Sequence, residues 1–182
     1  MRPELDDDED DVTISRYHIA LLKGDSFALW APPDVESKVI RDTGALVNTP
    51  HSVGELELYL APGRFVVIGR ANGYRVPYLH PSYQATTVVP GSGQSVLRTE
   101  GTGDDTFVSR AHFTLRGAAG GGLVLTNGVP GLDGAVRPPT NWTYLVEPDA
   151  RLLAPAEEVL ILYGVAIAIQ LPNRSVVRLT AR

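Results

Sequence analysis

Hydrophobic and polar residues alternate most clearly from residue 55 onward. The segment Glu55-Leu56-Glu57-Leu58-Tyr59-Leu60 has a period of two, which is typical of a strand with one buried face. Ala61-Pro62-Gly63 then predicts a turn, and the apolar run at residues 64–68 predicts a strand buried on both faces. This part of the chain therefore predicts β-structure.

Similar short segments recur on both sides of this pair. Strand character is found at residues 17–22, 26–30, 113–116, 123–126, 143–146, 159–163, 165–171 and 175–179. Residues 35–40 fit either a short strand or a helical turn. Pairs such as Gly121-Gly122, Asn127-Gly128 and Pro172-Asn173 separate the segments as turns. A sustained 3.6-residue period is missing, and the one candidate helix is residues 155–158. The pattern predicts an all-β fold, a β-sandwich.

The chain divides into three parts on this reading. Residues 1–12 are expected to form a flexible acidic tail, because the run from Asp6 to Asp11 repels itself. Residues 13–54 are expected to form a β-rich N-terminal extension or annex, and residues 55–182 the sandwich. Residues 71–103 have no period and are rich in Gly, Ser, Thr, Tyr and Pro. Such a long loop predicts an extra lobe or flap over neighbouring loops.

The composition of the chain excludes several classes of function. The net charge of −5 argues against a nucleic-acid partner, the chain has no cysteine, and its four histidines lack the spacing of a metal site. A signal segment, a membrane span of ~20 apolar residues and a phosphate loop of nucleotide enzymes are all missing. We expect a cytoplasmic monomer with no cofactor, no metal and no membrane contact.

Two short motifs carry the chemistry. Gly69-Arg70 ends the predicted strand at residues 64–68, and Val108-Ser109-Arg110-Ala111-His112 leads into the strand at residues 113–116. A guanidinium binds phosphate oxygens bidentately, and a hydroxyl adds a short hydrogen bond. On two neighbouring loops, Arg70 and Ser109 would hold a phosphate without reacting with it. A triad of Ser109, His112 and Asp104 or Asp105 is the weaker reading, because no nucleophile elbow or oxyanion site accompanies it.

From about residue 55 to residue 182 the chain resembles the forkhead-associated (FHA) domain family. The resemblance is carried in order by Gly69-Arg70, Ser109-Arg110-Ala111-His112, Thr140-Asn141-Trp142-Thr143, and residues 152–158 leading into Val159-Leu160-Ile161. It implies a sandwich of about eleven strands that binds phosphothreonine-containing proteins or peptides and is not an enzyme. The alternative is an FHA-like scaffold that docks a protein partner without phosphate.

The resemblance also implies roles for individual residues. Those expected to contact the phosphopeptide are Arg70, Ser109, Arg110, Thr140 and Asn141, and those expected to brace the site are Gly69 and His112. Arg110 is nearly as well explained as a solvated side chain. The asparagine is ambiguous, because Asn127-Gly128 has the dipeptide of the family whereas Asn141 is followed by Trp142 where the family has glycine. We favour Asn141 for its spacing to Glu157-Glu158.

The N-terminal part repeats one motif. Ser15-Arg16-Tyr17-His18 has the same pattern as Ser109-Arg110-Ala111-His112, although no Gly-Arg precedes it, and chance similarity is the simpler explanation. Thr13 follows the acidic run and is a candidate phosphorylation site. Phosphorylated Thr13 would be a tethered ligand for the site on its own chain, while a plain solvated tail is the simpler alternative.

Overall fold

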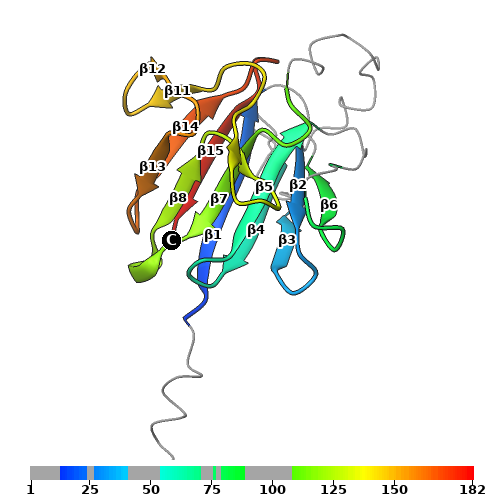
Figure 1. Cartoon of the computed structure of the whole chain (residues 1–182). Coiled ribbons are helices and arrows are strands. Elements are labelled where there is room, and N and C mark those ends of the chain that lie inside the picture. Colours follow the sequence, from blue (N-terminus) through cyan, green and yellow to red (C-terminus); the bar gives the residue numbers. More distant parts are fainter. Residues whose placement is uncertain (1–12, 24–26, 41–53, 71–75, 77–78, 89–107) are drawn as a thin grey trace, which may run out of the picture.

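The computed structural model describes residues 13–23, 27–40, 54–70, 76, 79–88 and 108–182. Two antiparallel sheets face each other as a β-sandwich (Figure 1). The seven-stranded sheet has the order β12 (Arg151–Leu152), β11 (Tyr144–Glu147), β14 (Ala166–Gln170), β15 (Val176–Ala181), β1 (Ser15–Lys23), β4 (Gly54–Leu60) and β3 (Glu36–Ile40).

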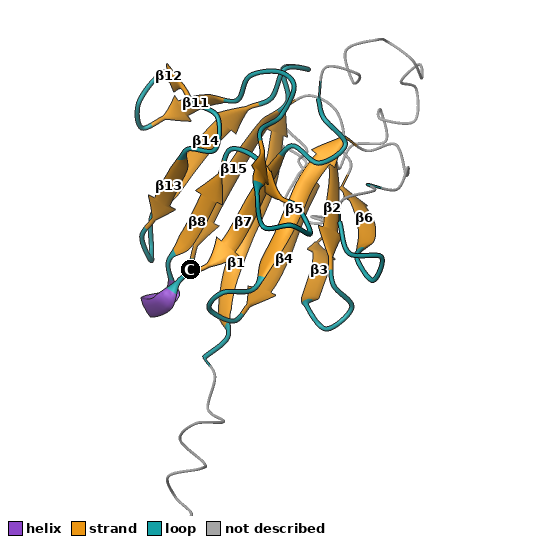
Figure 2. Cartoon of the chain, in the orientation of Figure 1, coloured by secondary structure: helices purple, strands orange, loops and turns teal. Residues whose placement is uncertain are grey.

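The six-stranded sheet has the order β13 (Glu158–Ile161), β8 (Leu123–Thr126), β7 (Phe113–Gly117), β5 (Phe65–Arg70), β2 (Phe27–Ala31) and β6 (Gln84–Val88). A two-stranded ribbon joins β9 (Val129–Pro130) to β10 (Val136–Arg137). The described helical structure is one short 3-10 turn, η4 (Ala119–Gly121), between β7 and β8 (Figure 2). The predicted all-β class and sandwich are confirmed, with fifteen strands in the described residues.

The hydrophobic core lies between the two sheets. Alternation in β4 gives Leu56, Leu58 and Leu60 to this core, and β5 is buried from Val66 to Gly69, as the sequence pattern predicts. The largest fully buried side chains come from both sheets: Tyr17, Phe27, Phe113, Ile19, Leu21, Leu29, Leu56, Leu58, Leu60, Ile68, Leu115 and Leu123. Full burial of each aliphatic or Phe side chain contributes roughly 1.5–3 kcal/mol, so these residues hold the sheets together.

The N-terminal strands belong to the sandwich, which corrects the predicted annex. Strand β1 lies between β15 and β4, with Ile19 opposite both Leu179 and Leu56. Strand β2 lies between β5 and β6. Each of these strands supplies ladder hydrogen bonds to two neighbours, so residue 54 does not divide two packed units. The predicted boundary at residue 54 rests on the weak hydrophobic period of residues 34–54. A local period carries no information about which strands pair.

Several irregular segments contain strands that the pattern did not predict. Residues 84–88, inside the predicted long loop, form β6, and the segment after Asn127 forms the β9–β10 ribbon. Residues 35–40, left open between strand and helix, form β3 from Glu36. The candidate helix at residues 155–158 is a turn that leads into β13.

A second apolar cluster covers the outer face of the six-stranded sheet. It contains Ala28, Trp30, Val67, Val76, Leu79, Ala111 and Val129, with Phe65 and Tyr83 packed against it. The rings of Phe65 and Tyr83 lie 5.7 Å apart between centroids. The described part of the segment after Arg70 therefore packs on this face of the sheet. Whether the rest of residues 71–103 forms the predicted flap over the loops lies outside the described residues.

Candidate functional site

The end of β5 lies directly against the Ser109 loop. The amide N–H of Arg70 donates to the carbonyl oxygen of Ser109 at 3.0 Å, and the N–H of His112 donates to the carbonyl oxygen of Ile68 at 2.8 Å. Gly69 permits this approach, because a Cβ there would lie 2.8 Å from the Ser109 carbonyl oxygen and still closer to that of Arg110. The two motifs predicted to share a site are thus joined through their main chains.

A third segment reaches the same point. The amide N–H of Thr140 donates to the side-chain oxygen of Ser109 at 3.0 Å. The Ser109 hydroxyl therefore accepts this bond with one lone pair and keeps its own proton for another acceptor. Ser109 is half-buried, so this proton is available at the surface, where three chain segments meet.

His112 holds the Ser109 loop from the interior of the sandwich. Its side chain is fully buried. Its Nδ1 accepts the amide N–H of Ser109 at 3.1 Å, which leaves the ring proton on Nε2. Nε2 then donates to Thr143 Oγ1 at 2.9 Å, and the Thr143 hydroxyl donates to Asn127 Oδ1 at 2.7 Å. Each donor in this chain meets an acceptor, so the neutral imidazole fixes both the Ser109 loop and the Thr143 segment.

Asn127 completes the network. Its Nδ2 donates to the carbonyl oxygen of Ala154 at 3.0 Å, and its main chain bonds Glu157 and Ala156. The side chain is 3 % exposed, so it braces the interior and is not placed to contact a peptide. The sequence pattern predicts Asn127 only as the alternative peptide-contacting residue and does not predict this bracing role, although an Asn-Gly pair directly after a strand is a signal for it.

Burial sets the protonation of His112. Desolvation lowers its pKa from 6.5 to about 4, while a backbone hydrogen bond with Trp142 acts in the opposite direction. The ring is therefore neutral near pH 7, as the direction of its hydrogen bonds requires. Both ring nitrogens bond groups other than the Ser109 hydroxyl, so this pair lacks the nucleophile–base contact of a serine enzyme. Asp104 and Asp105 lie outside the described residues.

The remaining predicted contact residues surround Ser109. Arg70 and Asn141 are half-buried, whereas Arg110 and Thr140 are exposed. Trp142 is 42 % exposed. Ala156 and Arg174 are the non-glycine residues with positive φ in the described chain, so Trp142 does not adopt the glycine geometry of the family. The roles of Arg70, Arg110, Thr140 and Asn141 in peptide binding stay predictions, but their segments meet at one end of the sandwich.

Thr13 lies at the opposite end. Ser15, two residues later, pairs with Leu60, just before the turn that leads into β5. From Phe65 to Arg70 the chain then runs five residues away, roughly 17 Å at about 3.3 Å per residue. Two residues span at most about 7 Å. The pairing of β1 therefore places Thr13 at the end of the sandwich away from Arg70, which counts against the expected tethered-ligand arrangement (Figure 1).

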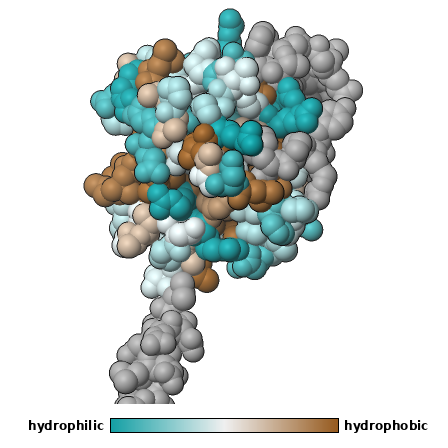
Figure 3. All heavy atoms as spheres, in the orientation of Figure 1, coloured by the Kyte–Doolittle hydropathy of each residue, from teal (hydrophilic) through white to brown (hydrophobic). Residues whose placement is uncertain are grey.

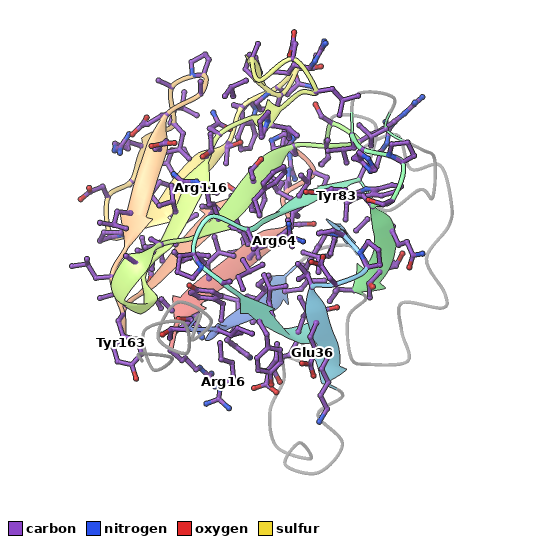
Figure 4. All side chains as sticks on the ribbon, turned by 60° about the horizontal axis from the view of Figure 1, so that its bottom comes forward. Arg16, Glu36, Arg64, Tyr83, Arg116 and Tyr163 are labelled. Carbon is purple, nitrogen blue, oxygen red and sulfur yellow. The ribbon has the colours of Figure 1, made fainter. Side chains whose placement is uncertain are left out.

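This second end has a different surface. An open hollow is lined by Thr13, Ser15, Pro62, Ala118, Gly120, Gly121 and Tyr163. Tyr163 points outward beside it, with Arg16 on the same end (Figure 4). Leu160 and Leu162 are more than half exposed along the β13 edge, where Figure 3 shows hydrophobic side chains. Turns and apolar side chains form this end, without a buried polar chain like that of His112 among the described residues.

Comparison with known proteins gives no match among family models, curated proteins or solved structures. Within the described ranges, no group of three His, Cys, Asp or Glu side chains is placed to hold a metal ion. The same ranges contain no helix of the length and apolarity needed to cross a bilayer.

Proposed function

We propose that this protein is a phosphothreonine-dependent protein-binding module. The observation that carries the proposal is the meeting of three segments at Ser109, whose carbonyl oxygen binds Arg70 and whose hydroxyl binds Thr140. The end of β5, the loop of residues 108–112 and the loop of residues 139–143 thus lie around the Ser109 hydroxyl. The same residues carry the resemblance to the FHA family.

The chemistry fits an anion that is bound and not transformed. A phosphate dianion would accept the Ser109 O–H and the forked N–H groups of Arg70, which are charge-assisted hydrogen bonds. The Thr140 N–H and the His112 network hold the Ser109 loop before the ligand arrives. Such preorganisation lowers the cost of binding, because fewer groups are ordered on association. The resemblance implies threonine over serine as the phosphorylated residue.

The test is a pair of titrations on purified protein. A degenerate phosphothreonine peptide library and its unphosphorylated counterpart are titrated by fluorescence anisotropy into the wild-type chain, Arg70→Ala and Arg178→Ala. Arg178 is an exposed arginine on β15 and serves as the matched control. Arg70→Ala should weaken binding of the phosphorylated library by roughly ten- to a hundredfold, since it removes a charge-assisted partner of about 1.5–3 kcal/mol.

Two results would contradict the proposal. Equal binding of both libraries by the wild-type chain would instead support a scaffold that docks proteins without phosphate. An Arg70→Ala variant that binds the phosphorylated library as well as Arg178→Ala does would remove Arg70 from the site.

A further inference from the structure

Trp142 is held at a fixed place beside the proposed phosphate site. Two residues earlier, the N–H of Thr140 bonds the Ser109 hydroxyl at 3.0 Å. One residue later, the fully buried Thr143 bonds His112 and Asn127. These contacts fix the backbone on both sides of the residue.

The Trp142 side chain faces solvent. Thr143 is 0 % exposed, whereas Trp142 before it is 42 % exposed. Thr143 turns inward to His112 and Asn127, while the residue before it lies at the surface. A tryptophan on a rigid backbone offers a large contact area with little further loss of conformational entropy, and such residues dominate the energetics of interfaces.

We propose that Trp142 determines specificity by packing against an apolar side chain that flanks the phosphothreonine of the ligand. This inference rests on the proposed function. A peptide held by Arg70 and Ser109 passes the loop of residues 139–143, because the Ser109 hydroxyl bonds Thr140 directly. The indole two residues further along then meets a side chain close to the phosphorylated residue.

The chemistry of the indole decides which side chain that is. Its large apolar face gains most from burial against another apolar surface, so the contact specific to Trp142 is with an apolar side chain.

The experiment separates phosphate binding from recognition of the flanking residue. Three probes are titrated: N-acetyl-phosphothreonine amide, a phosphothreonine library with Leu, Ile, Val and Phe around the phosphorylated residue, and the same library with Ala there. The proteins are wild type, Trp142→Ala, Trp142→Phe and Leu160→Ala, the last an exposed apolar residue on the β13 edge. Circular dichroism melting checks that each variant is folded.

Trp142→Ala should lose about five- to thirtyfold in affinity for the apolar library, and little for the alanine library or the amide. Trp142→Phe should retain part of the preference, and Leu160→Ala all of it. Equal losses for all three probes would mean that Trp142 only supports the loop, and no loss would mean that it contacts nothing. Either result overturns this inference while phosphate dependence stands. Wild-type protein that ignores phosphorylation would overturn the proposed function as well.

Discussion

The chain contains the pattern Ser-Arg-x-His twice, and the structure gives the two copies unrelated roles. In the first copy, His18 lies on the outer face of the seven-stranded sheet and bonds Glu55 Oε1 at 2.7 Å. In the second copy, His112 is fully buried and bonds the Ser109 main chain and the Thr143 hydroxyl. One histidine pairs across the surface of a sheet, and the other joins three loops.

The difference follows from the backbone. Residues 15–18 are extended within β1, where a separation of three residues places Ser15 and His18 on opposite faces of the sheet. Residues 109–112 form a turn before β7, so the chain folds back and the Ser109 N–H reaches His112 Nδ1. A four-residue pattern therefore specifies no function until the conformation is known.

The first copy of the pattern has no counterpart of Gly69. Substitution of Gly69 should have the largest effect. In Gly69→Ala the new methyl group overlaps the main chain of Arg110 and Ser109, which cannot move aside as a side chain can. We expect a loss of about 3 kcal/mol or more in the free energy of unfolding, or a displaced loop that no longer binds phosphopeptide. Urea denaturation and peptide titration measure both.

The matched control for this substitution is Gly134→Ala. Gly134 has a positive φ of 85°, which Gly69 does not, but a Cβ there meets nothing within 4 Å. It should cost only about 1 kcal/mol, through backbone conformation alone. Similar losses in the two variants would show that the close approach at Gly69 contributes nothing.

A fall in pH should lower the stability of the fold through His112, because burial lowers the pKa of this residue. Above pH 6.5 the ring is neutral in both states, but between pH 6.5 and about 4 the unfolded chain binds a proton that the folded chain does not. The contribution of neutral His112 to stability is thus complete near pH 7 and is lost progressively as the pH falls to about 4, by up to about 3 kcal/mol. Urea denaturation of the wild-type chain across this range measures the loss.

His112→Gln separates this contribution from the titration of carboxylates. The stability difference between the wild-type chain and the variant should shrink as the pH falls, because only the wild type carries the perturbed imidazole. A difference that stays constant from pH 7 to pH 4 would mean that His112 titrates normally in the folded protein.

His18→Ala should have the smallest effect. The imidazole bonds Glu55 in a pair whose side chains are 10 % and 21 % exposed, and a single hydrogen bond of this kind contributes about 0.5–1.5 kcal/mol. Phosphopeptide affinity should not change, because His18 lies on the outer face of the other sheet. A loss of stability as large as that of His112→Gln, measured in the same urea titration, would show that the two copies brace the fold equally.

Local pattern determined the strands with a strong signal. The period of two in β4 and the apolar run of β5 depend only on which faces of a strand are buried, so residues 54–70 followed from the sequence. Strand β6 did not, because its side chains are mostly exposed and carry no apolar period. Pairing with β2 makes it a strand, and that partner lies more than fifty residues away.

The sequence by itself determined the all-β class and the motifs at Gly69 and Ser109, because hydrophobic period and turn residues act over a few positions. Only the tertiary structure placed β1 inside the sandwich, set Thr13 at the far end from Arg70, and turned Asn127 inward to join Thr143 to residues 154–157. Those outcomes depend on which distant strands pair and which buried polar groups then need partners. No local pattern encodes either choice, since both are made when the two sheets pack.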